Sequence, residues 1–230
     1  MPKKALSALP FIDIHTHRFV SANDILAVEN VFAADIPKIK TFSERLFSAG
    51  LHPWHINILD FEKDLAGIEA FSHHPQILAF GEAGLDKLCK VDFKLQEIVF
   101  LKQLEIAAKT EKPMIIHCVK AFQEIISMYQ KAKSKTILIF HGFNNNRQIA
   151  ESLIKQGFYL SFGHALLNQK SNAFRIFRQI PDDRFFLETD DSGNSIEEIY
   201  AEASRIKGIS ILEMKSMVFK NFENCFKINA

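Results

Sequence analysis

The sequence is short of cysteine and of long apolar runs. Three cysteines, Cys89, Cys118 and Cys225, are scattered over 230 residues without a Cys-x-x-Cys pair. An odd number of scattered cysteines fits a reducing compartment better than a secreted, disulfide-stapled protein. The N-terminal stretch MPKKALSALPF is too poor in apolar residues for a signal peptide, and no later stretch approaches the roughly 20 apolar residues of a membrane span. We therefore expect a cytoplasmic protein with no membrane partner.

An excess of charge of one sign is also missing. The chain carries 28 Lys and Arg against 27 Asp and Glu, a formal net charge of +1. A global basic balance, as in proteins that bind nucleic acids through a broad positive surface, is thereby excluded. The densest basic run, KAKSK at residues 131–135, is typical of a solvated helix end. A nucleic-acid substrate would have to contact a local patch.

Apolar material is present in short pieces. Hydrophobic residues make up 47% of the sequence and include 22 Phe, which is enough for a sizeable core. Apolar runs alternate with amphipathic stretches without a Pro/Ser-rich linker, so we expect one domain over residues 1–230. The runs predicted to be strands are Phe11–His15, Ile25–Phe32, Leu46–Leu51, Ile77–Phe80, Met114–His117, Ile137–Phe140, Phe158–Phe162 and Phe185–Leu187. Strands that alternate with helices are parallel, and eight of them predict a (β/α)8 TIM barrel.

Several connections carry the sequence marks of helices. Asp92 can cap a helix over residues 93–109. Its expected apolar face consists of Ile98, Leu101, Leu104 and Ala108. Capping boxes at residues 195–198 and 210–213 open two C-terminal helices. Residues 18–24 leave room only for a short loop, so the helix after the first strand is expected to be missing.

The first strand, FIDIHTH at residues 11–17, carries polar side chains where a buried strand should be apolar. Residues two apart in a strand point to the same face, so Asp13, His15 and His17 share one side. A His-x-His pair alone is a weak motif, since it also occurs among satisfied core or surface histidines. Two imidazoles at a strand end can bind one metal ion.

Residues of metal-ligand type stand at the ends of other predicted strands as well. The set is His15, His17, Glu82, His117, His141 and Asp190. The carboxyl ends of the strands in an α/β barrel meet around its axis, where active sites are built. A polar group after an apolar run needs a strong partner, so these six are expected to act together. Four imidazoles and two carboxylates suffice for two adjacent divalent ions, with one carboxylate as a bridge.

These residues lie in motifs that occur in a known family. DIHTH, GLHPW, GEAGLD, PMIIH, HGF, LSFG and LETDD follow one another in the family's order and rough spacing. Over residues 10–226 the chain resembles the TatD-type metal-dependent hydrolases of the amidohydrolase superfamily. The resemblance implies a nuclease that removes nucleotides from DNA ends or acts on RNA. It implies two divalent ions, zinc or magnesium with manganese as a further option, the first held by His15, His17, Glu82 and Asp190 and the second by Glu82, His117 and His141.

The chain departs from the family pattern outside the metal ligands. An Arg-containing segment that usually follows the ETD motif is absent, and Val119 stands where the family commonly has Arg. The ligand set is complete, so the reaction class is better defined than the substrate.

Two of the ligands are expected to act in catalysis. Two ions about 3.5 to 4 Å apart can lower the pKa of a shared water toward 7 and clamp the oxygens of a phosphodiester. Glu82 is expected to bridge the ions and Asp190 to accept the proton of the attacking water. Asp13 lies deeper on the same face and is expected to orient a ligand, although the sequence names no partner for it.

Substrate contacts are predicted from loops that follow strands. Lys120 and Arg147 each lie within a few residues of a metal histidine and can contact phosphate. His52 in GLHPW ends the third strand and can contact either the substrate or a metal ligand, and His164 in SFGH, after the seventh strand, is a further candidate. The single tryptophan, Trp54, can stack on a base or belong to the core or rim, and both readings stay open.

Three functions stay open. The leading one is a metal-dependent phosphodiesterase, a deoxyribonuclease acting on DNA ends with no obligate protein partner. The same ligands could activate water against the amide, lactone or ester of a small molecule. A non-catalytic binding barrel is disfavoured by the complete ligand set, because function is judged from the site and not from the fold.

Overall fold

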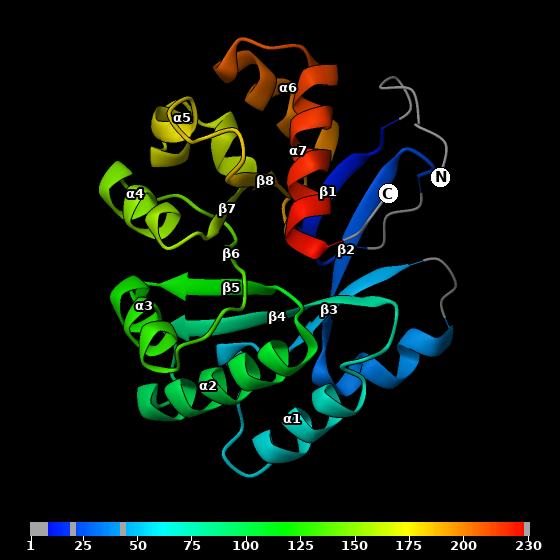
Figure 1. The fold of residues 1–230 in the computed structure, drawn as a ribbon, viewed down its shortest axis with the longest axis vertical. Helices are drawn as coiled ribbons and strands as arrows, with labels where there is room; N and C mark the ends of the chain where they lie inside the picture. Colours follow the sequence, from blue (N-terminus) through cyan, green and yellow to red (C-terminus); the bar gives the residue numbers. More distant parts are fainter. Residues whose placement is uncertain (1–8, 19–21, 42–44, 228–230) are drawn as a thin grey trace. The chain divides into compact units, whose positions relative to one another are not determined.

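The structure is a computed structural model, and it describes residues 9–18, 22–41 and 45–227 (Figure 1). The chain divides into two compact units. Unit 1 joins Met1–Val28 to His141–Ala230, and unit 2 is Glu29–Phe140. The expectation of a single domain stays a prediction.

Unit 2 is a parallel sheet with helices between its strands. Its elements are η2 (Ala33–Thr41), β3 (Leu46–Gly50), η3 (Pro53–His55), α1 (Phe61–Ala70), β4 (Ile77–Asp86), α2 (Phe93–Thr110), β5 (Met114–Val119), α3 (Phe122–Lys131) and β6 (Leu138–Phe140), while β2 (Ile25–Phe32) lies across the division. β3 pairs with β4, β4 with β5, and β5 with β6, all in parallel. Helices α1 and α2 lie next to each other against one side of this sheet (Figure 1).

Helix α2 confirms the expected start at Asp92, whose side chain accepts a hydrogen bond from the N–H of Leu95 at 3.0 Å. The predicted apolar face is wrong in part, because Ile98 and Ala108 are exposed. Two buried glutamines stand on the inward face instead. They bind the main chain of the sheet: Gln96 contacts Asp86, and Gln103 contacts both the N–H and the C=O of Leu51. The helix is therefore fixed to the strands by amides as well as by apolar packing.

Unit 1 contains the first strand and the C-terminal part of the chain. Its elements are β1 (Phe11–Thr16), α4 (Arg147–Lys155), β7 (Tyr159–Phe162), η4 (His164–Leu167), α5 (Asn172–Phe177), β8 (Phe185–Leu187), α6 (Ile196–Lys207) and α7 (Ile211–Phe226). β7 pairs with β8 in parallel, and Thr16 forms a parallel bridge with Asp190 beyond the end of β8. Both predicted capping boxes are present, at Ser195 and Ser210. The buried hydroxyl of Tyr200 on α6 donates to the C=O of Ile12 and accepts from its N–H, which anchors β1.

The connections after the first two strands are irregular. None of the described residues between β1 and β2 is helical, which agrees with the expected loss of a helix there. After β2 the chain forms the 3-10 helix η2, with Pro37 inside it. Proline removes a backbone N–H donor, so a regular α-helix is disfavoured at this point. No helix among the described residues is long and apolar enough to cross a membrane.

The backbones of β3, β4 and β5 approach closely around Glu82, and glycines make this approach possible. A Cβ on Gly84 would lie 1.9 Å from the carbonyl oxygen of His117, and Gly84 has a φ of +157°. A Cβ on Gly50 would lie 2.6 Å from the Cα of Gly81. Since backbone cannot move aside as a flexible side chain can, a side chain at position 84 would separate β4 from β5.

We expect Gly84→Ala to lower the free energy of unfolding by at least about 2 kcal/mol, because the added methyl overlaps the main chain of β5. Chemical denaturation of both proteins measures the difference. Gly67→Ala is the matched control: Gly67 lies inside α1 with nothing within 4 Å of an added Cβ, so alanine should raise stability by about 0.5 to 1 kcal/mol. Equal free energies of unfolding for the Gly84→Ala variant and the parent protein would contradict the requirement for glycine between β4 and β5.

Candidate metal centre

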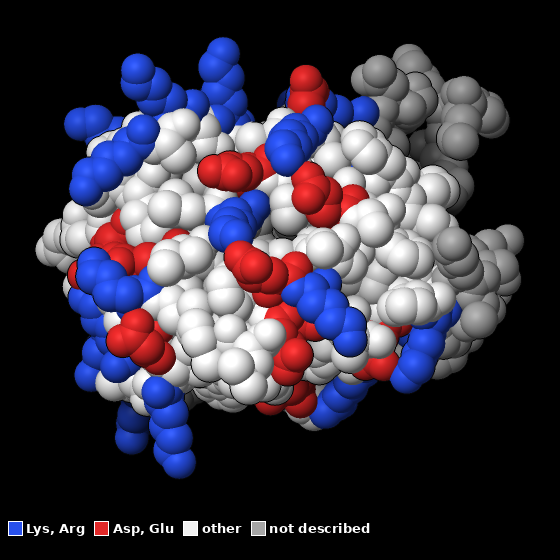
Figure 2. All heavy atoms as spheres, turned by 90° about the horizontal axis from the view of Figure 1, so that it is seen from below, with Lys and Arg blue, Asp and Glu red and all other residues white. Residues whose placement is uncertain are grey.

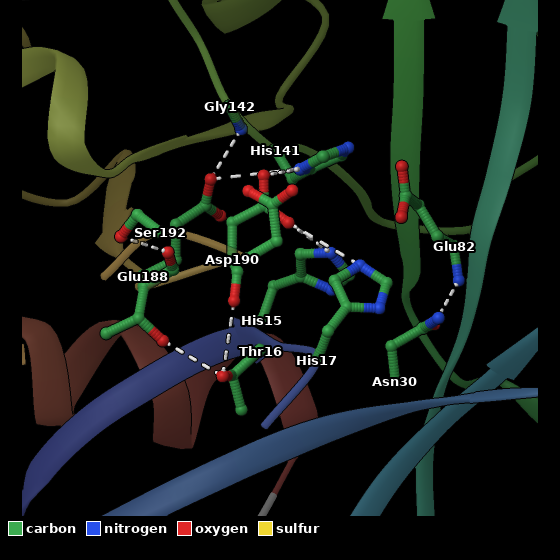
Figure 3. Close-up of polar contacts among 12 residues, drawn as sticks. His15, Thr16, His17, Asn30, Glu82, His141, Gly142, Glu188, Asp190 and Ser192 are labelled. Carbon is green, nitrogen blue, oxygen red and sulfur yellow. Dashed lines mark hydrogen bonds and ion pairs between the residues drawn. The ribbon is translucent and has the colours of Figure 1, made fainter. Parts of the chain in front are cut away.

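His15, His17 and Asp190 form a group of potential metal ligands in unit 1. His15 is fully buried, whereas the side chains of His17 and Asp190 are about one quarter exposed. The Oδ1 atom of Asp190 lies 3.6 Å from Nε2 of His15 and 3.5 Å from Nε2 of His17. Figure 3 shows both rings pointing toward this carboxylate. The three side chains could hold a single ion.

The spacing of these atoms fits a metal better than a hydrogen bond. Hydrogen bonds from nitrogen to oxygen are about 2.7 to 3.2 Å long, so both contacts to Asp190 are too long for one. Ligand atoms about 2.0 to 2.1 Å from a tetrahedral zinc ion lie roughly 3.4 Å from one another. Two imidazole nitrogens and a carboxylate oxygen are also the atoms that zinc prefers. Donor chemistry and spacing therefore both fit a divalent ion.

Asp13 fixes β1, which contains His15 and ends directly before His17, to the segment that carries Asp190. Its carboxylate accepts from the N–H of Thr189 at 2.9 Å and from the Thr189 hydroxyl at 2.6 Å. The next residue is also hydrogen-bonded to β1, because the N–H of Asp190 donates to the C=O of His15 at 2.9 Å. Burial raises the pKa of Asp13 to about 7, although the hydrogen bonds from Thr189 oppose the rise. Asp13 thus sets the position of Asp190 relative to the histidines.

Asp190 adopts a backbone conformation that non-glycine residues rarely use. Its φ is +54°, in the left-handed region. The conformation is held by the N–H of His17, which donates to the C=O of Asp190, and by the hydroxyl of Ser192, which donates to the C=O of Thr189. Backbone strain of this kind is often found at functional sites.

A second carboxylate of the LETDD run, Glu188, supports His141. Glu188 is fully buried, and its Oε1 accepts from the N–H of Gly142 at 2.6 Å and lies 3.8 Å from Nδ1 of His141 (Figure 3). Burial would raise the pKa of Glu188, but His141 and His15 outweigh it and hold the pKa below its usual value. The rings of His15 and His141 are 4.6 Å apart. Glu188 therefore fixes the main chain directly after His141, whose imidazole lies beside His15.

The second group of potential ligands, His52, Glu82 and His117, lies in unit 2. Oε1 of Glu82 is 2.7 Å from Nδ1 of His117 and 3.2 Å from Nε2 of His52. Burial lowers the pKa of His52, against the opposing effect of Glu82. A neutral imidazole keeps a lone pair that can bind a metal. The three side chains could hold one ion.

The sequence predicted Glu82 at the end of a strand, and this prediction is wrong: Glu82 lies inside β4. The strand continues through the glycine-rich stretch to Asp86, where Gly84 lies beside His117 on β5. The N–H of Glu82 donates at 2.6 Å to the side-chain oxygen of Asn30, which also accepts from the Ser48 hydroxyl (Figure 3). Asn30 therefore fixes the main chain that carries the Glu82 carboxylate.

Asp86, at the end of β4, connects several residues of this group. Its carboxylate accepts from Trp54 Nε1 at 2.6 Å and from the N–H of Leu88 at 2.7 Å, and it lies 3.3 Å from Nε2 of His117. Burial would raise the pKa of Asp86, but these hydrogen bonds outweigh it and lower the pKa. The His117 ring thus lies between two carboxylates, one nitrogen at Glu82 and the other at Asp86. Histidines that bind metals are commonly oriented by such a carboxylate.

The predicted ligands thus fall into two groups. Unit 1 brings together His15, His17, His141 and Asp190, and unit 2 brings together Glu82 and His117. Their union in one centre stays a prediction.

Sequence reasoning missed Asn30, Asp86 and Glu188. It left His52 as a contact of either the substrate or a metal ligand, and the structure places it 3.2 Å from Glu82. The sequence did offer a signal for Glu188, because an acidic residue stands there directly after the apolar run of a predicted strand. Asp86 ends the GEAGLD motif. No local sequence pattern points to Asn30, because its partners at residues 48 and 82 are distant in sequence.

Three of the predicted substrate contacts, Lys120, Arg147 and His164, lie at exposed positions, whereas His52 is buried. Lys120 follows β5 with a φ of +55°, and His164 begins η4. Arg147, at the start of α4, is exposed and forms an ion pair with Glu151 at 2.6 Å. No finding tests a contact between these residues and a substrate, so their roles stay predictions.

Solved structures with the same fold include proteins of one family. The TatD homologue YjjV of Escherichia coli K12 superimposes with a TM-score of 0.81 at 17% identity, covering 95% of this chain and 98% of that chain. A TatD-family hydrolase from Entamoeba histolytica gives a TM-score of 0.76 at 18% identity, over 95% and 98% of the two chains. The predicted (β/α)8 fold is confirmed.

The chain is also similar in sequence to known proteins. It is 27% identical to the uncharacterized metal-dependent hydrolase YabD of Bacillus subtilis over 76% of each chain. It is 29% identical to the 3'-5' ssDNA/RNA exonuclease TatD of Erwinia tasmaniensis, over 62% of this chain and 56% of that protein. The human 3'-5' RNA nuclease TATDN2 is 31% identical over 61% of this chain and 19% of its own length.

Removal of the Asp13 carboxylate should loosen the metal ligands. We expect Asp13→Ala to lower the free energy of unfolding by about 2 to 3 kcal/mol, because the buried N–H of Thr189 loses its acceptor. We also expect zinc to bind about tenfold more weakly, as measured by calorimetric titration. Asp13→Asn, which keeps one acceptor oxygen, should fall between the parent protein and Asp13→Ala.

The matched control is Asp24→Ala, which removes an exposed carboxylate from the turn before β2. It should leave both zinc affinity and stability close to those of the parent protein. Parental zinc affinity in the Asp13→Ala variant would contradict the positioning role of Asp13.

The family model for TatD-related DNases matches residues 16–227, and this range includes every candidate ligand except His15. The match bears out both the resemblance read from the motifs and the expectation of a metal-dependent hydrolase acting on ester bonds. The chain belongs to the TatD-related DNase family.

Proposed function

We propose that this protein is a metal-dependent nuclease that removes nucleotides from the ends of single-stranded DNA, with RNA as a further substrate. The observation that carries the proposal is the presence of two groups of imidazoles and carboxylates, His15, His17 and Asp190 in unit 1 and His52, Glu82 and His117 in unit 2, each with donor atoms within 4.8 Å of one another. Family membership and the two relatives named as 3'-5' nucleases support it. We extend the 3'-5' direction to this chain as part of the proposal.

Each group would hold one divalent ion, zinc or magnesium with manganese as a further option. When bound, the ions supply positive charge that acidifies a water molecule and neutralises the phosphodiester. His15 and His17 would bind as neutral imidazoles, and His52 is suited to the same role because burial lowers its pKa. The predicted bridge by Glu82 and the assignment of His141 to the second ion remain part of the proposal.

Asp190 would act both as a ligand and as the general base. Its side chain is about one quarter exposed, so water can reach the carboxylate, while His15 beside it is fully buried. Oδ1 of Asp190 lies 3.6 Å from His15 and 3.5 Å from His17, and Oδ2 lies 4.0 Å from Nδ1 of His141. This solvent-accessible carboxylate would accept the proton of the attacking water. Asp13 and the main-chain contacts of Asp190 would keep the carboxylate in place during the transfer.

Substrate affinity would come from local contacts. Charges of both signs are interspersed on the face in Figure 2, in line with the net charge of +1. Lys120 and Arg147 would contact phosphates, and His164 the sugar or base; a few such contacts suffice for a strand end. The three free cysteines fit a reducing compartment, and we propose that the enzyme acts in the cytoplasm.

Replacement of the proposed base should separate metal binding from turnover. We expect Asp190→Asn to retain bound metal through the two histidines and to lose activity by about 10²- to 10⁴-fold, because an amide cannot accept the proton. Metal content by mass spectrometry and cleavage of end-labelled single-stranded DNA measure the two effects. Asp191→Asn, an exposed neighbour, is the control and should keep full activity. Near-normal cleavage by the Asp190→Asn variant would remove Asp190 from the role of base.

Chelation tests the reaction class. With zinc, magnesium or manganese added, the protein should shorten end-labelled single-stranded DNA from the 3' end, and EDTA should abolish the reaction. A panel of small esters, lactones and amides, tested in parallel, should remain uncut. Activity confined to that panel would replace the nuclease by a small-molecule hydrolase, and a protein inert on every substrate would leave a binding barrel.

A further inference from the structure

Trp54, the only tryptophan of the chain, is exposed although it lies beside the second ligand group. It stands in η3, directly after β3, and is 60% exposed. A tryptophan usually buries much of its large apolar surface. The structure rules out the core position that the sequence left open for this residue.

The exposed indole is held in one orientation. Its Nε1 donates to the buried carboxylate of Asp86 at 2.6 Å, and its backbone N–H donates to Nδ1 of His52 at 3.1 Å. The carboxylate is itself fixed by the N–H of Leu88, and the main chain of Asp86 is fixed by Gln96. A side chain fixed in this way loses little conformational entropy when a ligand packs against it.

A hollow of about 520 Å³ opens beside the indole within unit 2. Its lining residues are Trp54, Asp86, Leu88, Cys89, Lys90, Val91 and Val119. Leu88 and Val119 supply apolar walls, and the exposed Lys90 supplies a positive charge. The combination of a flat aromatic wall, apolar sides and one cation suits a planar heterocycle that carries a phosphate.

The hollow adjoins the second ligand group. The Trp54 ring lies 5.0 Å from the His52 ring and 5.8 Å from the His117 ring, both at steep angles. Oδ2 of Asp86 lies 2.6 Å from Nε1 of Trp54 and 3.3 Å from Nε2 of His117. A ligand stacked on the indole would therefore lie next to any phosphate bound at His117 and Glu82.

We propose that this hollow is a nucleobase subsite, in which the base of the nucleotide next to the cleaved phosphate stacks on Trp54 and Lys90 contacts a flanking phosphate. The inference rests on the proposed nuclease function and names the part of the substrate that the site recognises. Stacking on an aromatic ring tolerates every base, so the subsite distinguishes a nucleotide from an abasic sugar phosphate without reading sequence.

The single tryptophan makes the subsite observable without turnover. Protein treated with EDTA is titrated with the dinucleotide dT-dT and with the same backbone lacking both bases, while tryptophan fluorescence is recorded. We expect saturable quenching by the dinucleotide and none by the abasic backbone. Equal quenching by both, or quenching by neither, would overturn the subsite.

A second measurement locates the effect in catalysis. Terminal abasic sites in end-labelled DNA should raise KM about tenfold for the parent enzyme but little for Trp54→Ala, which has already lost the stacking contact. Trp54→Phe should restore part of the difference. Ile98→Ala, at an exposed apolar position of α2 outside the hollow, is the control and should behave as the parent does. Equal sensitivity to abasic ends in the parent enzyme and in Trp54→Ala would contradict the proposal.

The two hypotheses fail in different ways. A protein that cleaves DNA but shows no dependence on bases retains the nuclease function and loses the subsite. A protein that cleaves no nucleic acid with any of the metals loses the nuclease function, and base-dependent quenching then tests the subsite by itself.

Discussion

The structure depends on satisfying carboxylates that are buried within apolar strands or at their ends. A buried carboxylate without hydrogen-bond donors destabilises a fold by several kcal/mol. Three of them here accept a backbone N–H from a neighbouring loop or turn: Asp13 from Thr189, Asp86 from Leu88 and Glu188 from Gly142. Asp13 and Glu188 thereby fix the main chain next to Asp190 and His141, and Asp86 also accepts from Nε1 of Trp54. The same contacts therefore stabilise the strands and position residues of the candidate site.

In this arrangement the candidate ligands are held in place and are still accessible to solvent. The supporting carboxylates are almost completely buried, whereas Asp190 and His17 reach solvent. The separation leaves ligands open to a metal ion and to water while their backbones stay fixed. In unit 2, Glu82 and His117 are held in the same manner by Asn30 and Asp86. Proteins commonly tune metal sites through such outer contacts.

The sequence predicted the fold class and the strands well, because apolar runs and turn residues are local features. The capping box at Ser195 and the helix start at Asp92 were found for the same reason. The partner of Asp13 could not be found, because Thr189 lies 176 residues away and only the folded chain brings them together. The inward face of α2 was misread because buried glutamines serve main-chain groups there, which no hydrophobic pattern indicates.

The central claim is that the group of His15, His17 and Asp190 and the group of Glu82, His117 and His52 each hold a divalent ion. Anomalous X-ray diffraction at the zinc edge, from crystals grown with zinc, tests it most directly. We predict one peak about 2.0 to 2.2 Å from ligand atoms of the first group and a second peak at the same distance from ligand atoms of the second. Zinc found only at surface histidines such as His73, with neither group occupied, would contradict the account.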